Sequence, residues 1–316
     1  MFFVLCLAIR ISHKFSAMIN ILNLVIIKTV TLLPKSIVQL FAGKYVAGEN
    51  HKTALDVVRS LNKQGFSATI DILGEHVNNE SEAQRITSEY MDLYDEIAED
   101  KLDCNISIKP SHIGLDLSEH KFLSNLKLLV DKAKSHDNFL RIDMEGSSIT
   151  DVTIKSYTEM LKISSAVGTV FQAYLFRTFD DVKNIQNANL NFRLCKGIYK
   201  ESEAISIQDR KLINDNYLKI LRYSFINKNY VGIATHDLNL LKRVHELINE
   251  LNIPSGQFEF QVLYGVPMSG WLEKHLEMGY NVRVYVPFGP DWYDYSIRRL
   301  KENPNIAGYV IKNLFR

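Results

Sequence analysis

Residues 67–73 read SATIDIL, a short apolar and β-branched run that is followed by a longer amphipathic stretch. The same alternation repeats along the chain. Seven more runs of this kind begin at Asn105, Phe139, Val170, Phe192, Tyr230, Phe258 and Asn281. The starts lie roughly 22 to 38 residues apart, which is the length of a strand, a crossover helix and two loops. Eight units in one uninterrupted series predict a closed (β/α)8 barrel, a TIM-like α/β fold.

An open sheet of the Rossmann type is the alternative architecture, and it would need phosphate-binding glycines after a strand. No GxGxxG follows any of the eight runs. Residues 43–50, GKYVAGEN, end in Glu49 and Asn50 where a P-loop carries Lys and Ser or Thr. The closed barrel is therefore favoured over the open sheet.

The first 62 residues are expected to form an N-terminal helical arm, with the catalytic barrel at residues 63–316. The apolar run at residues 2–9 is far shorter than the roughly 20 residues that cross a bilayer. Residues 19–39 are mostly apolar, and such an arm also suits contact with a membrane surface. Met18 offers a second start, so residues 1–17 are either an unstructured extension or lie ahead of the true start.

Charge and cysteine content argue against several function classes. Lys and Arg number 37 against 36 Asp and Glu, so a formal net charge of +1 gives no whole-molecule attraction to nucleic acid. The three cysteines are far apart in the sequence, and neither they nor the histidines show a metal-ligand spacing. The basic residues near the N-terminus follow its apolar run, whereas a secretory signal carries them ahead of it. We therefore expect a cytoplasmic chain without a metal or a nucleic-acid partner.

Polar residues recur where the predicted strands end. They are Asp71, Glu75, Lys109, Asp143, Glu145, Gln172, Arg193, Lys196, Thr235, His236, Gln261 and Tyr285. Active sites of (β/α)8 barrels form at this end, and unpaired buried charges are costly. The pattern predicts a polar cup that binds an anionic group on one side and a zwitterion on the other. Ion pairs that only close the barrel end are the alternative.

After the last strand we expect a turn at residues 287–292 and a helix from Tyr293 to about Asn303. This helix carries the adjacent Arg298 and Arg299, which project about 100° apart. A guanidinium fork matches the two oxygens of a carboxylate, so the pair suits an amino acid. A basic stripe on a solvated helix is the alternative.

Eight segments in this order resemble the proline dehydrogenase family, in particular its monofunctional, FAD-dependent members. They are TIDILGE (69–75), SIKPSHIGLD (107–116), RIDMEG (141–146), FQAY (171–174), RLCKGIYKESE (193–203), ATHD (234–237), FEFQVLYG (258–265), and RVYVPFG (283–289) with YSIRRLKEN (295–303). The resemblance extends from about residue 44 to residue 308. It implies a (β/α)8 barrel with non-covalent FAD, in agreement with the count of strands.

The resemblance also implies roles for individual residues. The set implied for FAD is Asp143, Gln172, Arg193, Cys195, Lys196, Gly197, Thr235, His236 and Glu302. The set implied for the substrate is Lys109, Tyr199, Leu263, Tyr285, Tyr295, Arg298 and Arg299. Catalysis is implied for Lys109, Asp143, Tyr285, Arg298 and Arg299. Glu75 is implied to pair with Arg298 as a gate over the site.

The implied activity is oxidation of L-proline to Δ1-pyrroline-5-carboxylate by hydride transfer from C5 to flavin N5, the first step of proline catabolism. The family usually passes its electrons to a membrane quinone, which implies peripheral contact with the inner face of the cell membrane. Two alternatives stay open. One is a flavin enzyme for hydroxyproline or another cyclic secondary amine, although the bulk and hydroxyl of Tyr295 should disfavour 4-hydroxyproline. The other is a barrel that serves as a non-catalytic sensor.

Four residues depart from the usual family pattern. Asp237 replaces the Asn of a common ATHN segment and adds a negative charge near the cofactor. Ile198 stands where alanine is usual and would crowd the substrate pocket. Lys200 replaces a frequently aromatic neighbour of the flavin, and Asp209 replaces a threonine found in some members. These departures bear on cofactor affinity and flavin potential rather than on the reaction class.

Overall fold

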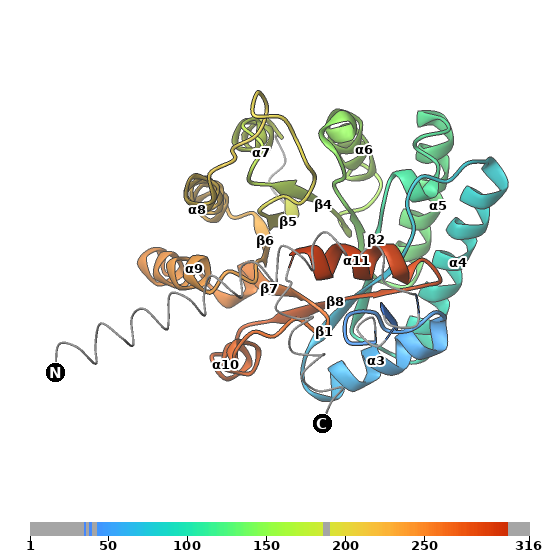
Figure 1. Cartoon of the computed structure of the whole chain (residues 1–316), viewed down its shortest axis with the longest axis horizontal. Coiled ribbons are helices and arrows are strands. Elements are labelled where there is room, and N and C mark those ends of the chain that lie inside the picture. The colour runs from blue at the N-terminus through green and yellow to red at the C-terminus, as the bar shows by residue number, and fades with distance from the viewer. Residues whose placement is uncertain (1–34, 36–37, 40–42, 186–189, 303–316) are drawn as a thin grey trace, which may run out of the picture.

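The computed structural model describes residues 35, 38–39, 43–185 and 190–302. Its strands form a closed, all-parallel barrel in the order β1-β2-β3-β4-β5-β6-β7-β8 (Figure 1). The strands are β1 Ser67–Ile72, β2 Cys104–Ile108, β3 Leu140–Ile142, β4 Val167–Gln172, β5 Asn191–Cys195, β6 Tyr230–Ala234, β7 Phe258–Leu263 and β8 Val282–Phe288. The predicted fold class is confirmed, because each of the eight apolar runs supplies one strand.

Most of the described helices surround the barrel, whereas the last one crosses in front of the strands in the view of Figure 1. They are α3 His51–Lys63, α4 Glu80–Glu99, α5 Glu119–Ser135, α6 Thr150–Met160, α7 Thr178–Asn184, α8 Arg210–Ile226, α9 Leu238–Leu251, α10 Trp271–Glu277 and α11 Trp292–Glu302. The 3-10 helices are η2 Ser111–Ile113, η3 Ser147–Ile149 and η4 Ser255–Gln257. The apolar core lies between the strands and this helical layer.

Side-chain caps fix where several helices begin. The Asn50 side chain accepts a hydrogen bond from the Thr53 N–H at the start of α3, and the Asn79 side chain caps α4 in the same way. The capping residues are Asp209 for α8 and Asp237 for α9. An N-cap of this kind satisfies backbone N–H groups that have no partner within the helix, and it typically stabilises a protein by about 1 kcal/mol.

Helix α3 belongs to the predicted N-terminal arm, and it packs against β1 and β8. Its Ala54, Leu55 and Val58 are buried in the main apolar core. Residues 1–34 lie outside the described residues, so the arm and its boundary with the barrel stay predictions.

Several strand boundaries differ from the sequence-based expectation, and those of β4 and β8 have a clear physical reason. Strand β4 begins at Val167 rather than Val170. The sequence pattern did not indicate this start, because glycine is uncommon within strands and Gly168 interrupts the apolar run. The strand ends at Gln172, where the chain turns. Strand β8 continues through Pro287 to Phe288, so the turn predicted from residue 287 begins later. Pro287 has no N–H to donate, but it pairs in register with Asp71, and its carbonyl accepts a hydrogen bond from Ala47 N at 2.9 Å.

The barrel interior is polar, and two glycines make room for its long side chains. Arg141 of β3 is 2% exposed and donates hydrogen bonds to Thr169 O at 3.0 Å and to the Asn191 side chain at 3.0 Å. Gly168 lies against this arginine, and Gly232 lies against the side-chain amide of Gln261. A side chain at either glycine would have to displace a buried hydrogen-bonded group.

We predict that Gly168→Ala destabilises the protein by about 1 to 3 kcal/mol in urea unfolding. A Cβ at this position would lie 2.6 Å from Phe139 Cζ and 2.7 Å from the Asn191 carbonyl, and backbone cannot easily move aside. Gly256→Ala is the matched control, because no atom of the described residues lies within 4 Å of a Cβ there. Equal unfolding midpoints for the two variants would contradict this account of the barrel interior.

Candidate active site

The Asp143 carboxylate lies at the centre of a buried cluster at the C-terminal end of the barrel. Its Oδ1 accepts hydrogen bonds from Ser107 Oγ at 3.1 Å and Arg193 Nη1 at 2.8 Å, and its Oδ2 accepts one from Tyr285 OH at 3.1 Å. The Arg193 guanidinium also lies over the Tyr285 ring, 5.0 Å from its centroid. These residues come from or directly follow β2, β3, β5 and β8, so their bonds cross the barrel interior. Asp143, Arg193 and Tyr285, three of the predicted site residues, thus meet at one point.

Lys109 forms a second buried ion pair in the same cup. Its Nζ lies 2.5 Å from Asp71 Oδ2, and the side chains of Lys109 and Asp71 are 12% and 1% exposed. Burial alone would lower the pKa of Lys109, but the carboxylates of Asp71 and Asp143 raise it above its usual value. Lys109 therefore remains a cation, and Asp71 is its counter-ion.

The Tyr285 phenol stays protonated. Burial raises its pKa well above the usual value, and the negative charges of Asp143 and Asp71 act in the same direction. A protonated phenol donates its hydrogen bond to Asp143 and keeps the hydroxyl fixed. The cup therefore carries a neutral donor, a cation and a carboxylate within one connected network.

A buried series of hydrogen-bonded polar side chains also holds Arg193. The Arg193 guanidinium also donates through Nε to Gln261 Oε1, and Gln261 Nε2 donates to Glu259 Oε1 at 2.6 Å. Arg283 Nε lies 3.0 Å from both oxygens of Glu259. The orientation of Arg193 is therefore set by β7 and β8 as well as by Asp143.

The predicted cofactor residues on β5 and β6 lie on neighbouring loops. Lys196, directly after β5, pairs with Asp237 at 2.5 Å, and Asp237 N donates to Thr235 Oγ1 at 3.1 Å. His236 Nε2 accepts a hydrogen bond from Leu263 N at 3.0 Å, so this ring nitrogen carries no proton. Hydrogen bonds thus connect the ends of β5, β6 and β7.

Gln172 and Gly197 shape the neighbouring wall of the cup. Gln172 Nε2 donates to Glu145 O at 2.9 Å, whereas its Oε1 is buried and has no hydrogen-bond partner among the described residues. Gly197 has φ +115, and a Cβ there would overlap the Tyr174 ring. The wall therefore offers an unpartnered acceptor beside a closely packed stretch of backbone.

Cys195 is half-buried at the end of β5, and burial raises its pKa to about 11, so it stays a thiol.

The loop that carries Glu75 is held by η2 and by the residues that follow β3. His76 N donates to Ser111 Oγ at 3.3 Å, and Ser111 donates from its backbone and hydroxyl to Glu145 at 2.9 and 2.5 Å. Glu75 itself is half-buried. The predicted gate pair with Arg298 stays a prediction, because the Arg298 side chain lies outside the described residues.

Helix α11 begins against the end of β1. Tyr295 is 8% exposed and belongs to a small apolar cluster with Tyr45, Val46 and Leu73. The start of its helix is confirmed within one residue, and the helix is described as far as Glu302, but the side chains of Arg298, Arg299 and Glu302 lie outside the described part. Tyr199 and Leu263 are half-buried, and Leu263 ends β7. The roles of all these residues remain proposals.

Sequence reasoning missed three members of the cluster. Asp71 and Gln261 stood among the strand-end polar residues but had no assigned role, and Ser107 was not singled out at all. Ser107 precedes Lys109 by two residues, and that spacing places both side chains on the same face of a strand. The spacing is the one signal that could have identified it.

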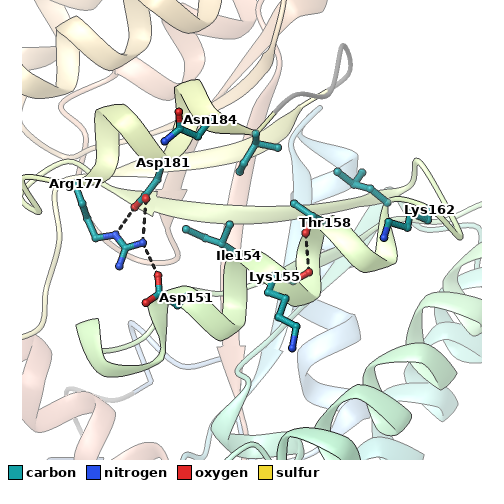
Figure 2. A pocket seen from close by; sticks show the side chains of 10 residues that line it. Asp151, Ile154, Lys155, Thr158, Lys162, Arg177, Asp181 and Asn184 are labelled. Carbon is teal, nitrogen blue, oxygen red and sulfur yellow. Dashed lines mark hydrogen bonds and ion pairs between the residues drawn. The ribbon is translucent and has the colours of Figure 1, made fainter.

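The hollow in Figure 2 is not this site. It lies between α6 and α7 in the outer layer, where Arg177 pairs with Asp181 at 2.7 Å and with Asp151 at 2.5 Å. Long surface side chains line it, and none belongs to the predicted site.

Among the described residues, no helix is long and apolar enough to cross a membrane, and no cluster of three potential metal ligands occurs.

Comparison with known proteins gives one consistent family. The model of the proline dehydrogenase family matches residues 54–311. Proline dehydrogenase 1 of Bacillus subtilis subsp. natto is 38% identical over 290 residues, which cover 92% of this chain and 96% of that protein. Proline dehydrogenase of Deinococcus radiodurans is 31% identical, with 87% of this chain and 90% of that protein covered.

A solved structure extends the similarity to the fold. Proline utilization A (PutA) from Bdellovibrio bacteriovorus, inactivated by N-propargylglycine, aligns with a TM-score of 0.77 and 27% identity. The alignment covers 83% of this chain but only 32% of that one. The chain thus corresponds to about a third of the PutA protein.

We predict that His112 contributes to acid sensitivity of the fold. Burial lowers its pKa to about 3, with the charges of Lys109 and Arg85 acting in the same direction, against about 6.5 in the unfolded chain. Its stabilising effect is complete above pH 6.5 and is lost as the pH falls toward 3. The drop in unfolding free energy between pH 7 and 4.5 should be smaller by about 2 kcal/mol in His112→Gln.

His120→Gln is the matched control, because His120 is exposed on α5. Urea unfolding at both pH values gives the comparison. A wild-type pH dependence in the His112 variant would contradict the assignment of a neutral, buried imidazole.

Proposed function

The chain belongs to the proline dehydrogenase family, and we propose that its polar cup is where L-proline is oxidised with FAD as the cofactor. Proline dehydrogenase activity is the function of the chain. The observation that supports this location is the buried network in which Arg193 and Tyr285 converge on Asp143, with Lys109 held by Asp71 in the same cup.

The residues present fit FAD. Lys196 and Arg193 supply cationic donors for a pyrophosphate. The buried Gln172 Oε1 has no partner in the part of the chain that the structure describes, so a ligand N–H is its expected complement. Gly197 brings backbone close to the same wall. We propose that Asp143, Gln172, Arg193, Lys196, Thr235, His236 and Glu302 hold FAD, with the backbone of Cys195 and Gly197 beside it. Bound FAD supplies a hydride acceptor, flavin N5, for the hydrogen at C5 of proline.

Substrate binding is proposed for the cup and helix α11 together. Arg298 and Arg299 would grip the carboxylate, while Lys109, Asp143 and the walls formed by Tyr199, Leu263, Tyr285 and Tyr295 surround the ring. The amine must be neutral when the hydride leaves C5, and burial of the ring in the cup disfavours its charged ammonium form. Glu75 would pair with Arg298 to close the site and exclude water.

The product would be Δ1-pyrroline-5-carboxylate, in the first step of proline catabolism. We further propose that the electrons pass to a membrane quinone and that the cytoplasmic protein contacts the inner face of the cell membrane. The apolar sequence of residues 19–39 supports such contact.

A related cyclic amine such as 4-hydroxyproline is the competing substrate. Tyr295 bears on the choice, because it is buried among Tyr45, Val46 and Leu73 and cannot easily move to admit a further hydroxyl. A sensor without turnover is disfavoured by the intact network around Asp143.

The purified protein is expected to show the visible absorbance of oxidised flavin and to lose it when proline is added without oxygen. The same preparation should respond to 4-hydroxyproline at least about tenfold more weakly in kcat/KM, since a misplaced hydroxyl in a packed pocket costs about 1.4 kcal/mol or more. A colourless protein, or a yellow one that proline does not bleach, would refute the proposal.

Arg299→Ala should weaken proline binding by about 2 to 5 kcal/mol, because it leaves the substrate carboxylate without one of its cations. The flavin content per chain should stay at the wild-type level. Arg222→Ala serves as the control, since Arg222 pairs with Glu250 on the outer helices. Steady-state kinetics measure the effect, and an unchanged KM in the Arg299 variant would remove this residue from the site.

A further inference from the structure

We propose that Asp237 acts as a fixed counter-ion of Lys196 and thereby weakens the binding of FAD. The inference rests on the proposed function, in which Lys196 meets the pyrophosphate of FAD. Asp237 would oppose the binding of FAD indirectly, because it acts on the cofactor through Lys196.

The two side chains face one another from adjacent loops. Lys196 directly follows β5, Asp237 follows the end of β6, and the two strands pair in parallel. Lys196 Nζ lies 2.5 Å from Asp237 Oδ2, and both side chains are 29% exposed, so the pair is open to an approaching ligand. An anion that reaches Lys196 therefore meets an ammonium group whose charge is already balanced.

Asp237 cannot easily move away when a ligand arrives. Its Oδ1 caps α9 and accepts hydrogen bonds from Asn239 N at 3.0 Å and Leu240 N at 3.2 Å. Its Oδ2 accepts a further hydrogen bond from Asn214 Nδ2 at 3.1 Å. Burial would raise the pKa of Asp237, but the hydrogen bonds from Lys196 and Asn214 hold it well below its usual range, so the carboxylate stays charged at neutral pH. The negative charge is therefore fixed beside Lys196.

Asparagine separates the helix cap from the charge of the residue. Asn is as good an N-cap as Asp, so its oxygen can take over the bonds that Oδ1 accepts at the start of α9. Its NH2 group would then replace Oδ2 and could not accept a hydrogen bond from Lys196. Asp237→Asn should thus keep the start of α9 while it removes the counter-ion of Lys196, and its effect on an anionic ligand reports the loss of that counter-ion.

The test uses the full-length protein, stripped of flavin and titrated with FAD while the quenching of flavin fluorescence is followed. Asp237→Asn is expected to lower the Kd for FAD about tenfold, equivalent to about 1.4 kcal/mol. The Kd of the variant should also rise more steeply with salt than that of the wild type, because an unbalanced ammonium is screened more effectively. In a Lys196→Met background, Asp237→Asn should change the Kd by less than about twofold.

Asp95→Asn is the matched control, because it breaks a Lys132–Asp95 pair of the same 2.5 Å length on the outer helices. Its Kd should equal that of the wild type. An unchanged or weaker affinity in Asp237→Asn, or a gain that persists without Lys196, would overturn the inference. These results are distinct from failure of the proposed function itself, in which the wild-type chain would not bind FAD.

Discussion

A carboxylate inside a barrel must be surrounded by donors, because an unpaired buried charge costs several kcal/mol. Asp143 satisfies this requirement with Ser107, Arg193 and Tyr285, and Asp71 satisfies it with Lys109. Ser107 and Lys109 come from or directly follow β2, which neighbours the strands of both carboxylates, whereas Arg193 and Tyr285 come from β5 and β8, which do not neighbour β3. The barrel must therefore close before Asp143 can be fully paired. The same bonds fix the side chains in place before a ligand arrives, which is the condition for preorganised catalysis.

Because the barrel interior is polar, it contributes little to the stability of the fold. Arg141, Glu259 and Arg283 occupy space that apolar side chains fill in many barrels of this type. Their bonds restrict conformation more than they add stability, since buried ion pairs roughly offset their own desolvation. The driving force for folding must therefore come from the apolar layer between the strands and the surrounding helices, where most of the large buried side chains lie.

Sequence patterns predicted the barrel better than they predicted its pairings. Runs rich in Val, Ile and Phe located every strand, because this signal is local. Strand β8 ran past Pro287 because pairing with β1 outweighed the local turn signal. The partner of a charge depends on strands far apart in the sequence, so neither the Lys109–Asp71 nor the Lys196–Asp237 pair could be predicted. The roles of individual residues in cofactor and substrate binding came from the resemblance to the family, and they remain proposals.

The paired charges also limit where an anion can be held. At the floor of the cup, Lys109 is balanced by Asp71 and Arg193 by Asp143, so the two ion pairs together add no net charge. A ligand carboxylate gains little from such pairs unless one of their bonds is broken. The cations that select an amino acid are therefore proposed to come from outside these two pairs, as in the role proposed for Arg298 and Arg299. A source of positive charge that closes over a neutral floor would let binding of the substrate and closure of the site occur as one event.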